Sequence, residues 1–258
     1  MAPVEERQDR RSAAQVLGSW LKELVIVVLG ALVASTLLRV FVIQMFNIPS
    51  ESMENTLLVG DRVAVQKVTG YQRGDVIVFQ DTQHWLADSG RQLSPLEQAL
   101  VFIGFAPDES KGYLVKRLIG MPGDHVACCD AQGRVTVNGV AVDETDYLYK
   151  DPTTGQQADP SLYSFDLVVP KGRVFVMGDH RNASEDSRPH LCEELSGQPK
   201  GMKGFVPEAD IVGVGLAVVY PFTHWHGLGR SASWASVPDP TGDPPAEPVV
   251  TVWPDICG

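Results

Sequence analysis

The hydrophobic positions divide the chain into one long apolar run near the N-terminus and many short runs after it. The long run covers 20 residues, 24–43, with Arg39 as its one charged residue. A helix of that length is about 30 Å long, which matches the hydrocarbon thickness of a bilayer. Arg39 lies near one end, where a long side chain reaches the headgroups. The pattern predicts a single transmembrane anchor helix over residues 24–43.

Two other interpretations of this run remain open. A buried core helix is one, although such a helix usually carries a polar face. A cleavable signal peptide is the other, because Val33-Ala34-Ser35 is a small-residue site, although the apolar run continues past it. Under the anchor interpretation, the positive-inside rule places residues 1–23 in the cytoplasm and all that follows outside. The basic residues that set this orientation are Arg7, Arg10, Arg11 and Lys22.

After the anchor, short alternating or apolar runs separated by turn residues predict a mainly β domain. The clearest strand candidates are residues 61–68, 74–79, 113–120, 124–129, 172–179 and 211–222. Residues 134–142 form two alternating arms around Asn138-Gly139, a strong signal for a tight hairpin. We therefore expect an extracytoplasmic β domain over residues 44–235.

Three segments interrupt or follow this β pattern. Two are inserts, at about 80–112 and about 130–170. The first contains a predicted helix over 94–105, with Ser94 as N-cap and Glu97 completing a capping box, packed on the domain or on the membrane. The proline-rich tail, residues 236–258, is predicted to be disordered.

Charge and cysteine content narrow the classes of function. The formal net charge of −11 argues against a general nucleic-acid binder. No CxxC or Cys/His spacing is present, so we predict no metal and no cofactor. A disulfide is permitted outside the membrane, and Cys192 with one of the adjacent pair is one option, but the sequence leaves the connectivity open. The four cysteines are Cys128, Cys129, Cys192 and Cys257.

Candidate chemistry begins with two serines and a lysine. Ser50 and Ser52 stand in the stretch IPSESMENTL just after the anchor, and alone they would indicate only a turn. Lys116 lies in a predicted strand and shares a face with Leu114 and Leu118. If that face is buried, the amine loses its proton and becomes a competent base for a serine hydroxyl. If the face is exposed, Lys116 is a solvated edge residue.

A third element is the stretch GDHRNASEDSR, residues 178–188. We expect Asp179 to pair with Arg181 and Asp186 to pair with Arg188 through charge-assisted hydrogen bonds. Such pairs would make a rigid loop that holds a catalytic lysine in position.

Taken together, these stretches resemble bacterial type I signal peptidases from the anchor to about residue 222. The motifs IPSESMENTL, GDRVAVQK, RGDVIVF, VKRLIGMPGD and GDHRNASEDSR occur in the order found in that family. The resemblance implies a coiled β-sheet catalytic domain with a smaller inserted region, preceded by one transmembrane helix. Two positions depart from the family pattern: Asn55 replaces a proline, and His180 replaces an asparagine.

The resemblance also implies roles for individual residues. Ser52 matches the nucleophile and Lys116 the general base. Ser50 matches the hydroxyl that completes an oxyanion hole with the backbone amide of Ser52. Ser184 matches the serine that orients the lysine, and Met53 matches a residue near the substrate cleft. The matching structural supports are Asp179, Arg181, Asp186 and Arg188.

The implied function is removal of signal peptides from exported preproteins at the cytoplasmic membrane, after small residues of the Ala-x-Ala type. The partners are then preproteins and the lipid bilayer, with no nucleic acid, and the oligomeric state is not indicated. Two rivals remain: a self-processing Ser/Lys protease and a membrane-tethered β module without catalysis. The first usually carries a DNA-binding head, and no helix-turn-helix pattern precedes Ser52.

Overall fold

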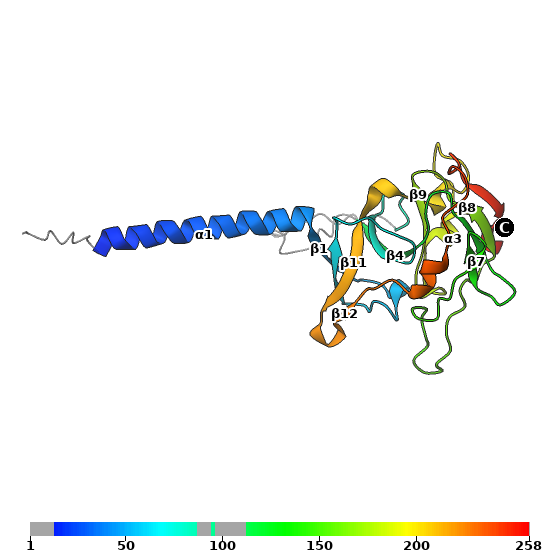
Figure 1. Cartoon of the computed structure of the whole chain (residues 1–258), viewed down its shortest axis with the longest axis horizontal. Coiled ribbons are helices and arrows are strands. Elements are labelled where there is room, and N and C mark those ends of the chain that lie inside the picture. The colour runs from blue at the N-terminus through cyan, green and yellow to red at the C-terminus, as the bar shows by residue number, and fades with distance from the viewer. Residues whose placement is uncertain (1–12, 87–93, 96–111, 258) are drawn as a thin grey trace, which may run out of the picture.

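The computed structural model describes residues 13–86, 94–95 and 112–257. Helix α1 (Ala13–Phe41) extends away from a β domain as a single rod (Figure 1). Apolar side chains along α1 are exposed, for example Leu24 at 60% and Val27 at 66%. Within the described residues, no helix meets the combined length and apolarity required to cross a membrane.

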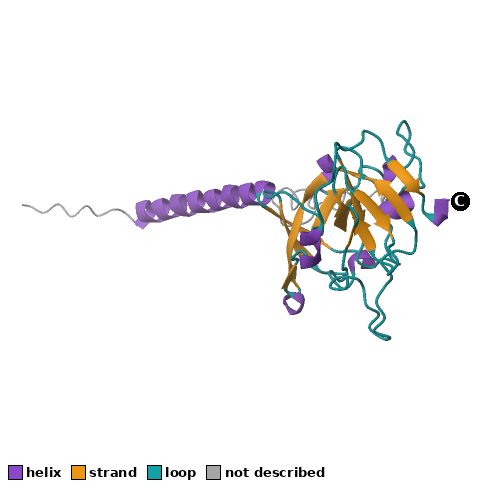
Figure 2. Ribbon diagram, turned by 45° about the vertical axis from the view of Figure 1, so that its right-hand side comes forward, coloured by secondary structure: helices purple, strands orange, loops and turns teal. Residues whose placement is uncertain are grey.

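The larger sheet is antiparallel and curled (Figure 2). Its strands run in the order β1-β2-β11-β3-β4-β9-β10, with β12 paired to β11. Its strands are β1 (Ile43–Asn47), β2 (Arg62–Gln66), β3 (Val76–Gln80), β4 (Tyr113–Gly120), β9 (Arg173–Met177), β10 (Val206–Pro207), β11 (Ile211–Tyr220) and β12 (His226–Gly227). The mainly β prediction is confirmed.

A second antiparallel sheet has five strands in the order β13-β8-β5-β6-β7. They are β13 (Val249–Val252), β8 (Phe165–Val168), β5 (His125–Cys128), β6 (Val135–Val137) and β7 (Val140–Ala141). Asn138 and Gly139 join β6 to β7 with φ values of 52° and 79°, as a two-residue hairpin turn requires. The predicted hairpin is therefore confirmed.

Helical structure in the β domain is limited to short turns. The one α-helix there is α3 (Ser187–His190) among the described residues. The predicted helix over 94–105 lies outside the described residues except for Ser94 and Pro95. The 3-10 helices are η1 (Glu51–Met53), η2 (Met202–Gly204), η3 (Glu208–Asp210), η4 (Phe222–His224), η5 (Ala232–Ser236) and η6 (Asp255–Cys257).

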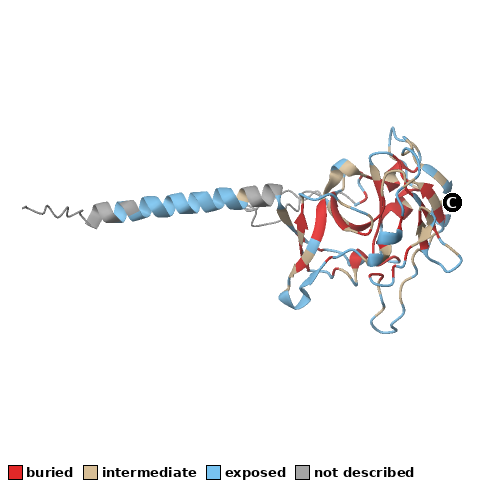
Figure 3. Cartoon of the chain, viewed as in Figure 1, coloured by how far each residue is buried: buried red, intermediate tan, exposed pale blue. Residues whose placement is uncertain are grey.

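Strand β3 shows why the larger sheet is apolar on both faces. Val76 and Val78 belong to one buried cluster, while Ile77 and Phe79 belong to another. Successive strand residues point to opposite faces, so a continuous apolar run fits a strand that is covered on both sides. The buried residues consequently run through the middle of the sheet (Figure 3). This position lets β4, the next strand, carry side chains into a water-excluded interior.

The C-terminal tail is ordered, so the prediction of disorder for residues 236–258 is wrong for the described part, 236–257. Strand β13 pairs with the edge strand β8, and Trp253 packs against the cluster beneath the smaller sheet. Cys257 forms a disulfide with Cys192, 65 residues away in the sequence. The proline content suggested disorder, but the apolar residues of β13 and Trp253 find a partner surface that composition does not reveal.

The suggested pairing of Cys192 with one of the adjacent cysteines is also wrong. Cys128 and Cys129 are bonded to each other instead. Every cysteine is therefore in a disulfide.

Candidate active site

Ser52 lies in the 3-10 helix η1, in the connection between β1 and β2. The turn is closed by the Glu54 amide, which donates to the Glu51 carbonyl at 2.9 Å. Met53 and Leu57, 1% and 0% exposed, fix this connection to a core cluster that also contains Ile48. Burial of these apolar residues thus fixes a segment whose serine is only 7% exposed.

Met53 itself is a core residue. Its side chain is buried in this cluster one position after Ser52, and its place near the substrate cleft stays a prediction.

Lys116 enters the site from the middle of β4, where it pairs with Ile77 of β3. Its side chain is 2% exposed, and its Nζ donates to the Ser52 Oγ at 2.5 Å. Burial lowers the pKa of the Lys116 amine to about 8, although the negative charge of Asp186 acts in the opposite direction. Of the two alternatives that the sequence left open for Lys116, the structure has the buried one, and Lys116 and Ser52 meet across 64 positions of sequence.

Ser50 contributes a second hydroxyl beside Ser52. Its Oγ lies 3.3 Å from the Ser52 Oγ, and Ser50 is exposed while Ser52 is buried. The two hydroxyls are therefore close enough to contact one group bound at this place.

Ser184 is placed close to the dyad by Gly178. A methyl group on Gly178 would overlap both the Ser184 Oγ and the Ser52 carbonyl oxygen, so only glycine permits this approach. The Ser184 Oγ is buried and makes no hydrogen bond within the described part of the chain. An unpaired buried hydroxyl is costly, which makes Ser184 an available partner for a group in the site.

The carboxylate of Asp179 is bound by Arg117, so the predicted pair of Asp179 with Arg181 is wrong. Arg117 Nε and Nη2 lie 2.7 and 2.6 Å from the two carboxylate oxygens, and Thr56 Oγ1 donates at 2.5 Å. Burial lowers the pKa of Arg117, but the charge of Asp179 outweighs this and raises it. Arg117 lies on β4 directly after Lys116, so this pair connects the lysine strand to the loop and to the nucleophile turn.

Arg181 instead binds Glu144, a residue outside every motif identified in the sequence. Both guanidinium Nη atoms contact the Glu144 carboxylate, which also accepts from the Tyr147 hydroxyl at 2.7 Å. Arg181 Nε donates to the Gly178 carbonyl at 3.0 Å. The guanidinium thus supports the backbone of the residue that touches Ser52 and Ser184.

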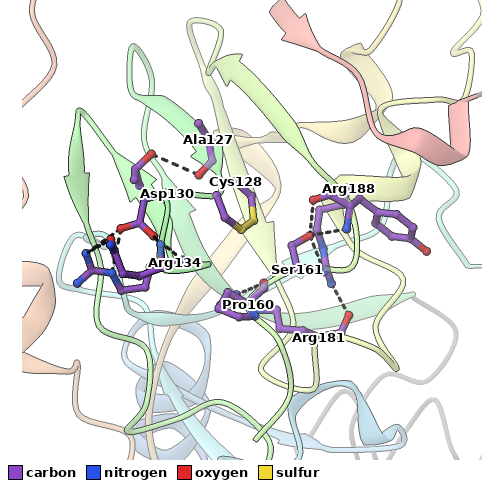
Figure 4. Close-up of a disulfide and its surroundings, with 12 residues drawn as sticks. Ala127, Cys128, Asp130, Arg134, Pro160, Ser161, Arg181 and Arg188 are labelled. Atoms are coloured by element: carbon purple, nitrogen blue, oxygen red, sulfur yellow. Dashed lines mark hydrogen bonds and ion pairs between the residues drawn. A yellow bond between two sulfur atoms is a disulfide. The ribbon is translucent and has the colours of Figure 1, made fainter.

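The predicted pair of Asp186 with Arg188 is confirmed. Arg188 Nε and Nη2 lie 2.8 and 2.7 Å from the Asp186 carboxylate, which also accepts from the Gly178 amide at 2.9 Å. Burial raises the pKa of Asp186, and the charge of Arg188 more than reverses this. Figure 4, drawn around the disulfide of Cys128, shows Arg181 and Arg188 beside Pro160 and Ser161, which they contact.

Sequence reasoning missed Arg117, Thr56 and Glu144. Arg117 carried a usable signal, because a second basic residue in an apolar strand requires a buried anion. Glu144 carried none, since it lies in a polar stretch where acidic residues are ordinary. No group of histidine, cysteine and acidic residues within the described ranges could hold a metal ion.

Comparison with known proteins agrees with these motifs. The family model for "Signal peptidase, peptidase S26" matches residues 19–220. A signal peptidase I of Mycobacterium tuberculosis is 37% identical over 236 residues, covering 83% of this chain and 77% of that protein. A probable signal peptidase I of Mycobacterium leprae is 38% identical over 215 residues, covering 73% and 72% respectively.

A crystal structure of a signal peptidase I from Enterococcus faecalis is also similar in sequence, at 26% identity. It covers 57% of this chain and 97% of that chain, with a TM-score of 0.29, too low for an argument about the fold. The matches in sequence confirm the resemblance to type I signal peptidases.

Proposed function

Because the chain belongs to the signal peptidase family, peptidase S26, and is a serine peptidase that removes signal peptides, we propose that Ser52 and Lys116 perform the reaction. The observation that carries this proposal is the 2.5 Å contact between the Lys116 Nζ and the Ser52 Oγ in a buried environment. A lysine whose pKa is lowered to about 8 is neutral in a usable fraction near neutral pH.

In the proposed first step, neutral Lys116 accepts the proton of the Ser52 hydroxyl while the oxygen attacks the scissile carbonyl carbon. The carbonyl oxygen gains the negative charge and is stabilised by the Ser50 hydroxyl and the Ser52 backbone amide. Collapse of this intermediate transfers the proton from Lys116 to the leaving amine and gives an acyl-enzyme. The same lysine then activates water for hydrolysis of the ester.

Ser184 is proposed to orient the lysine amine during these steps. Its buried hydroxyl has no hydrogen-bond partner among the described residues and lies beside Gly178, next to the dyad. Asp179, Arg181, Asp186 and Arg188 support the loop through the ion pairs described above and have no direct chemical role.

The proposed location is the cytoplasmic membrane, with residues 1–23 inside and an anchor that starts at residue 24 and ends with α1 at Phe41. The catalytic domain outside begins at β1 (Ile43–Asn47) and includes the tail strand β13 (Val249–Val252). The apolar run and its exposed side chains support the anchor, since apolar helix faces left open to water are unfavourable. Ser52 follows Ile43 by nine residues, so the extended chain keeps it within roughly 30 Å of the membrane. Such a position suits preproteins cut just outside the bilayer, after small residues of the Ala-x-Ala type.

Cleavage of a detergent-solubilised preprotein by the full chain tests this function. Wild type, Ser52→Ala and Lys116→Ala are compared, with the exposed Lys171→Ala as the matched control, and the new N-terminus is sequenced. We expect cutting after a small-x-small site by wild type and Lys171→Ala, and none by the other two. Activity retained in Lys116→Ala would overturn the dyad. A wild type that cuts no preprotein, while folded, would favour a non-catalytic module.

A further inference from the structure

The side chain of His180 makes contacts that the Ser/Lys chemistry does not require. His180 is 8% exposed and occupies the position where the resembled family has asparagine. Its backbone amide donates to the Ser52 carbonyl at 3.1 Å, so the residue touches the nucleophile directly through the main chain.

The imidazole contacts both sides of the nucleophile turn. Its Nδ1 lies 3.3 Å from the Glu51 carbonyl oxygen and 3.3 Å from the Glu54 carboxylate. The Glu51 carbonyl is also the acceptor that closes this turn through the Glu54 amide. One ring nitrogen thus bridges the residue before Ser52 and the residue two positions after it.

Tyr149 holds the ring in this orientation. The two rings stack with centroids 3.7 Å apart and an interplanar angle of 20°. Tyr149 is itself fixed, because its backbone amide donates to the Asp179 carbonyl at 3.1 Å. Stacking against Tyr149 therefore limits the rotation of the imidazole. The His180 side chain consequently loses little rotamer entropy when it forms its polar contacts.

We propose that His180 is a positioning residue for Ser52, in which a ring stacked on Tyr149 ties Glu51 to Glu54 and so fixes the turn that carries the nucleophile. This inference rests on the proposed function of Ser52. The stacking component needs a flat aromatic ring, so an asparagine at this position would retain a polar contact and lose the clamp. Because no hydrogen bond or ion pair joins the ring to Lys116 among the described residues, its role is in the geometry of attack and not in the basicity of the amine.

Peptide-cleavage kinetics of the full chain test the proposal with His180→Ala, His180→Asn and His180→Phe. We expect kcat to fall about tenfold in His180→Ala, because a displaced nucleophile slows attack, while KM changes less than twofold. The kcat of His180→Phe, which keeps the stack on Tyr149 but lacks Nδ1, should fall as far as that of His180→Ala. The kcat of His180→Asn should fall less. The midpoint of the rising pH limb stays at its wild-type value in all three. His125→Ala, an exposed histidine paired with Asp166 in the smaller sheet, is the matched control.

A double-mutant cycle with Glu54→Ala separates positioning from general loss of structure. If His180 acts through the turn, His180→Ala costs little further kcat once Glu54 is absent. Full additivity, wild-type kcat in His180→Ala, or a loss of kcat matched by a loss of folded protein would each overturn the proposal. Wild type and Ser52→Ala run in the same assay: if Ser52→Ala still cleaves, the dyad fails, whereas a dead Ser52→Ala with normal His180→Ala refutes only the positioning role.

Discussion

Buried positive charge is paired with carboxylates in the loop of residues 178–188 but is left unpaired at Lys116. Lys116 has no carboxylate within ion-pair distance among the described residues, and burial lowers its pKa to about 8. Arg117, the next residue, is equally buried but meets Asp179 through two nitrogens, and its guanidinium also covers the Tyr147 ring at 3.9 Å. In the loop, Arg181 and Arg188 each have a buried carboxylate as well.

The difference indicates that the buried lysine and the buried arginines have different roles within one region. Lys116, which we propose loses its proton during the reaction, has no close counter-ion among the described residues, and a carboxylate partner would hold the proton on the amine. Cations that only hold backbone are paired, since an unpaired buried guanidinium cannot deprotonate and would be strongly unfavourable. The site thus combines one unpaired cation with a rigid surrounding network.

The largest effect is expected from removing the unpaired cation. Lys116→Met should lower kcat by about 10²–10⁴-fold, the usual contribution of a general base. The same change should stabilise the fold at pH 7 by up to about 3 kcal/mol, at about 1.4 kcal/mol per unit of lowered pKa. Cleavage assays and chemical denaturation measure the two effects.

The sign of the stability change follows from the direction of the pKa shift. The folded amine releases its proton near pH 8 and the unfolded amine near 10.5, so the folding penalty is full below pH 8 and disappears as pH rises to 10.5. The stability gain of Lys116→Met should shrink over that range. A gain that does not change between pH 7 and 10.5 would contradict an unpaired, desolvated lysine.

The paired region should respond in the opposite sense. Glu144→Gln leaves Arg181 buried without a carboxylate, and we expect a loss of about 3–5 kcal/mol in the free energy of unfolding. Asp130→Asn, which weakens the solvent-screened pair with Arg134, is the control and should cost much less stability than Glu144→Gln. Urea denaturation of both variants measures the contrast, and equal losses would remove the distinction between the two classes of pair.

The pH dependence of catalysis tests the unpaired lysine in the active enzyme. Below pH 8 the neutral fraction of Lys116 falls about tenfold per pH unit, so kcat/KM should rise with pH and level off above about 8. Initial rates between pH 6 and 10 measure this limb. A limb centred near pH 10.5 would mean that the amine is solvated in the working enzyme.

The smallest effect concerns the turn itself. Asn55 has a φ of 80°, a left-handed conformation that asparagine tolerates better than most residues and that proline cannot adopt. Asn55→Gly should change stability by less than about 1 kcal/mol, while Asn55→Ala should lose roughly 1–2 kcal/mol. Thermal unfolding of the two variants measures these stability changes. An alanine variant as stable as wild type would argue against the left-handed turn.

The sequence predicted the strands because burial on a sheet imposes a period that is visible locally. Alternation predicted the strand that contains Lys116, and Asn138-Gly139 predicted the hairpin of β6 and β7. The motifs predicted Ser52 and Lys116 together. Local periodicity also placed Lys116 on a face with Leu118, a residue with no exposed surface. These features depend on residues that are close together in the sequence, so they can be predicted from the spacing of residue types along the chain.

Only the tertiary structure decided which charges meet. Asp179 was expected to bind Arg181, two residues away. Instead, β4 runs beside β9 and brings Arg117 to Asp179. Arg181 binds Glu144, which lies in a loop before β8. The same holds for the ordered tail and for the disulfide of Cys192 with Cys257. Ion pairs, edge-strand pairing and disulfides depend on distances between segments far apart in the sequence, and those distances exist only once the sheets have packed.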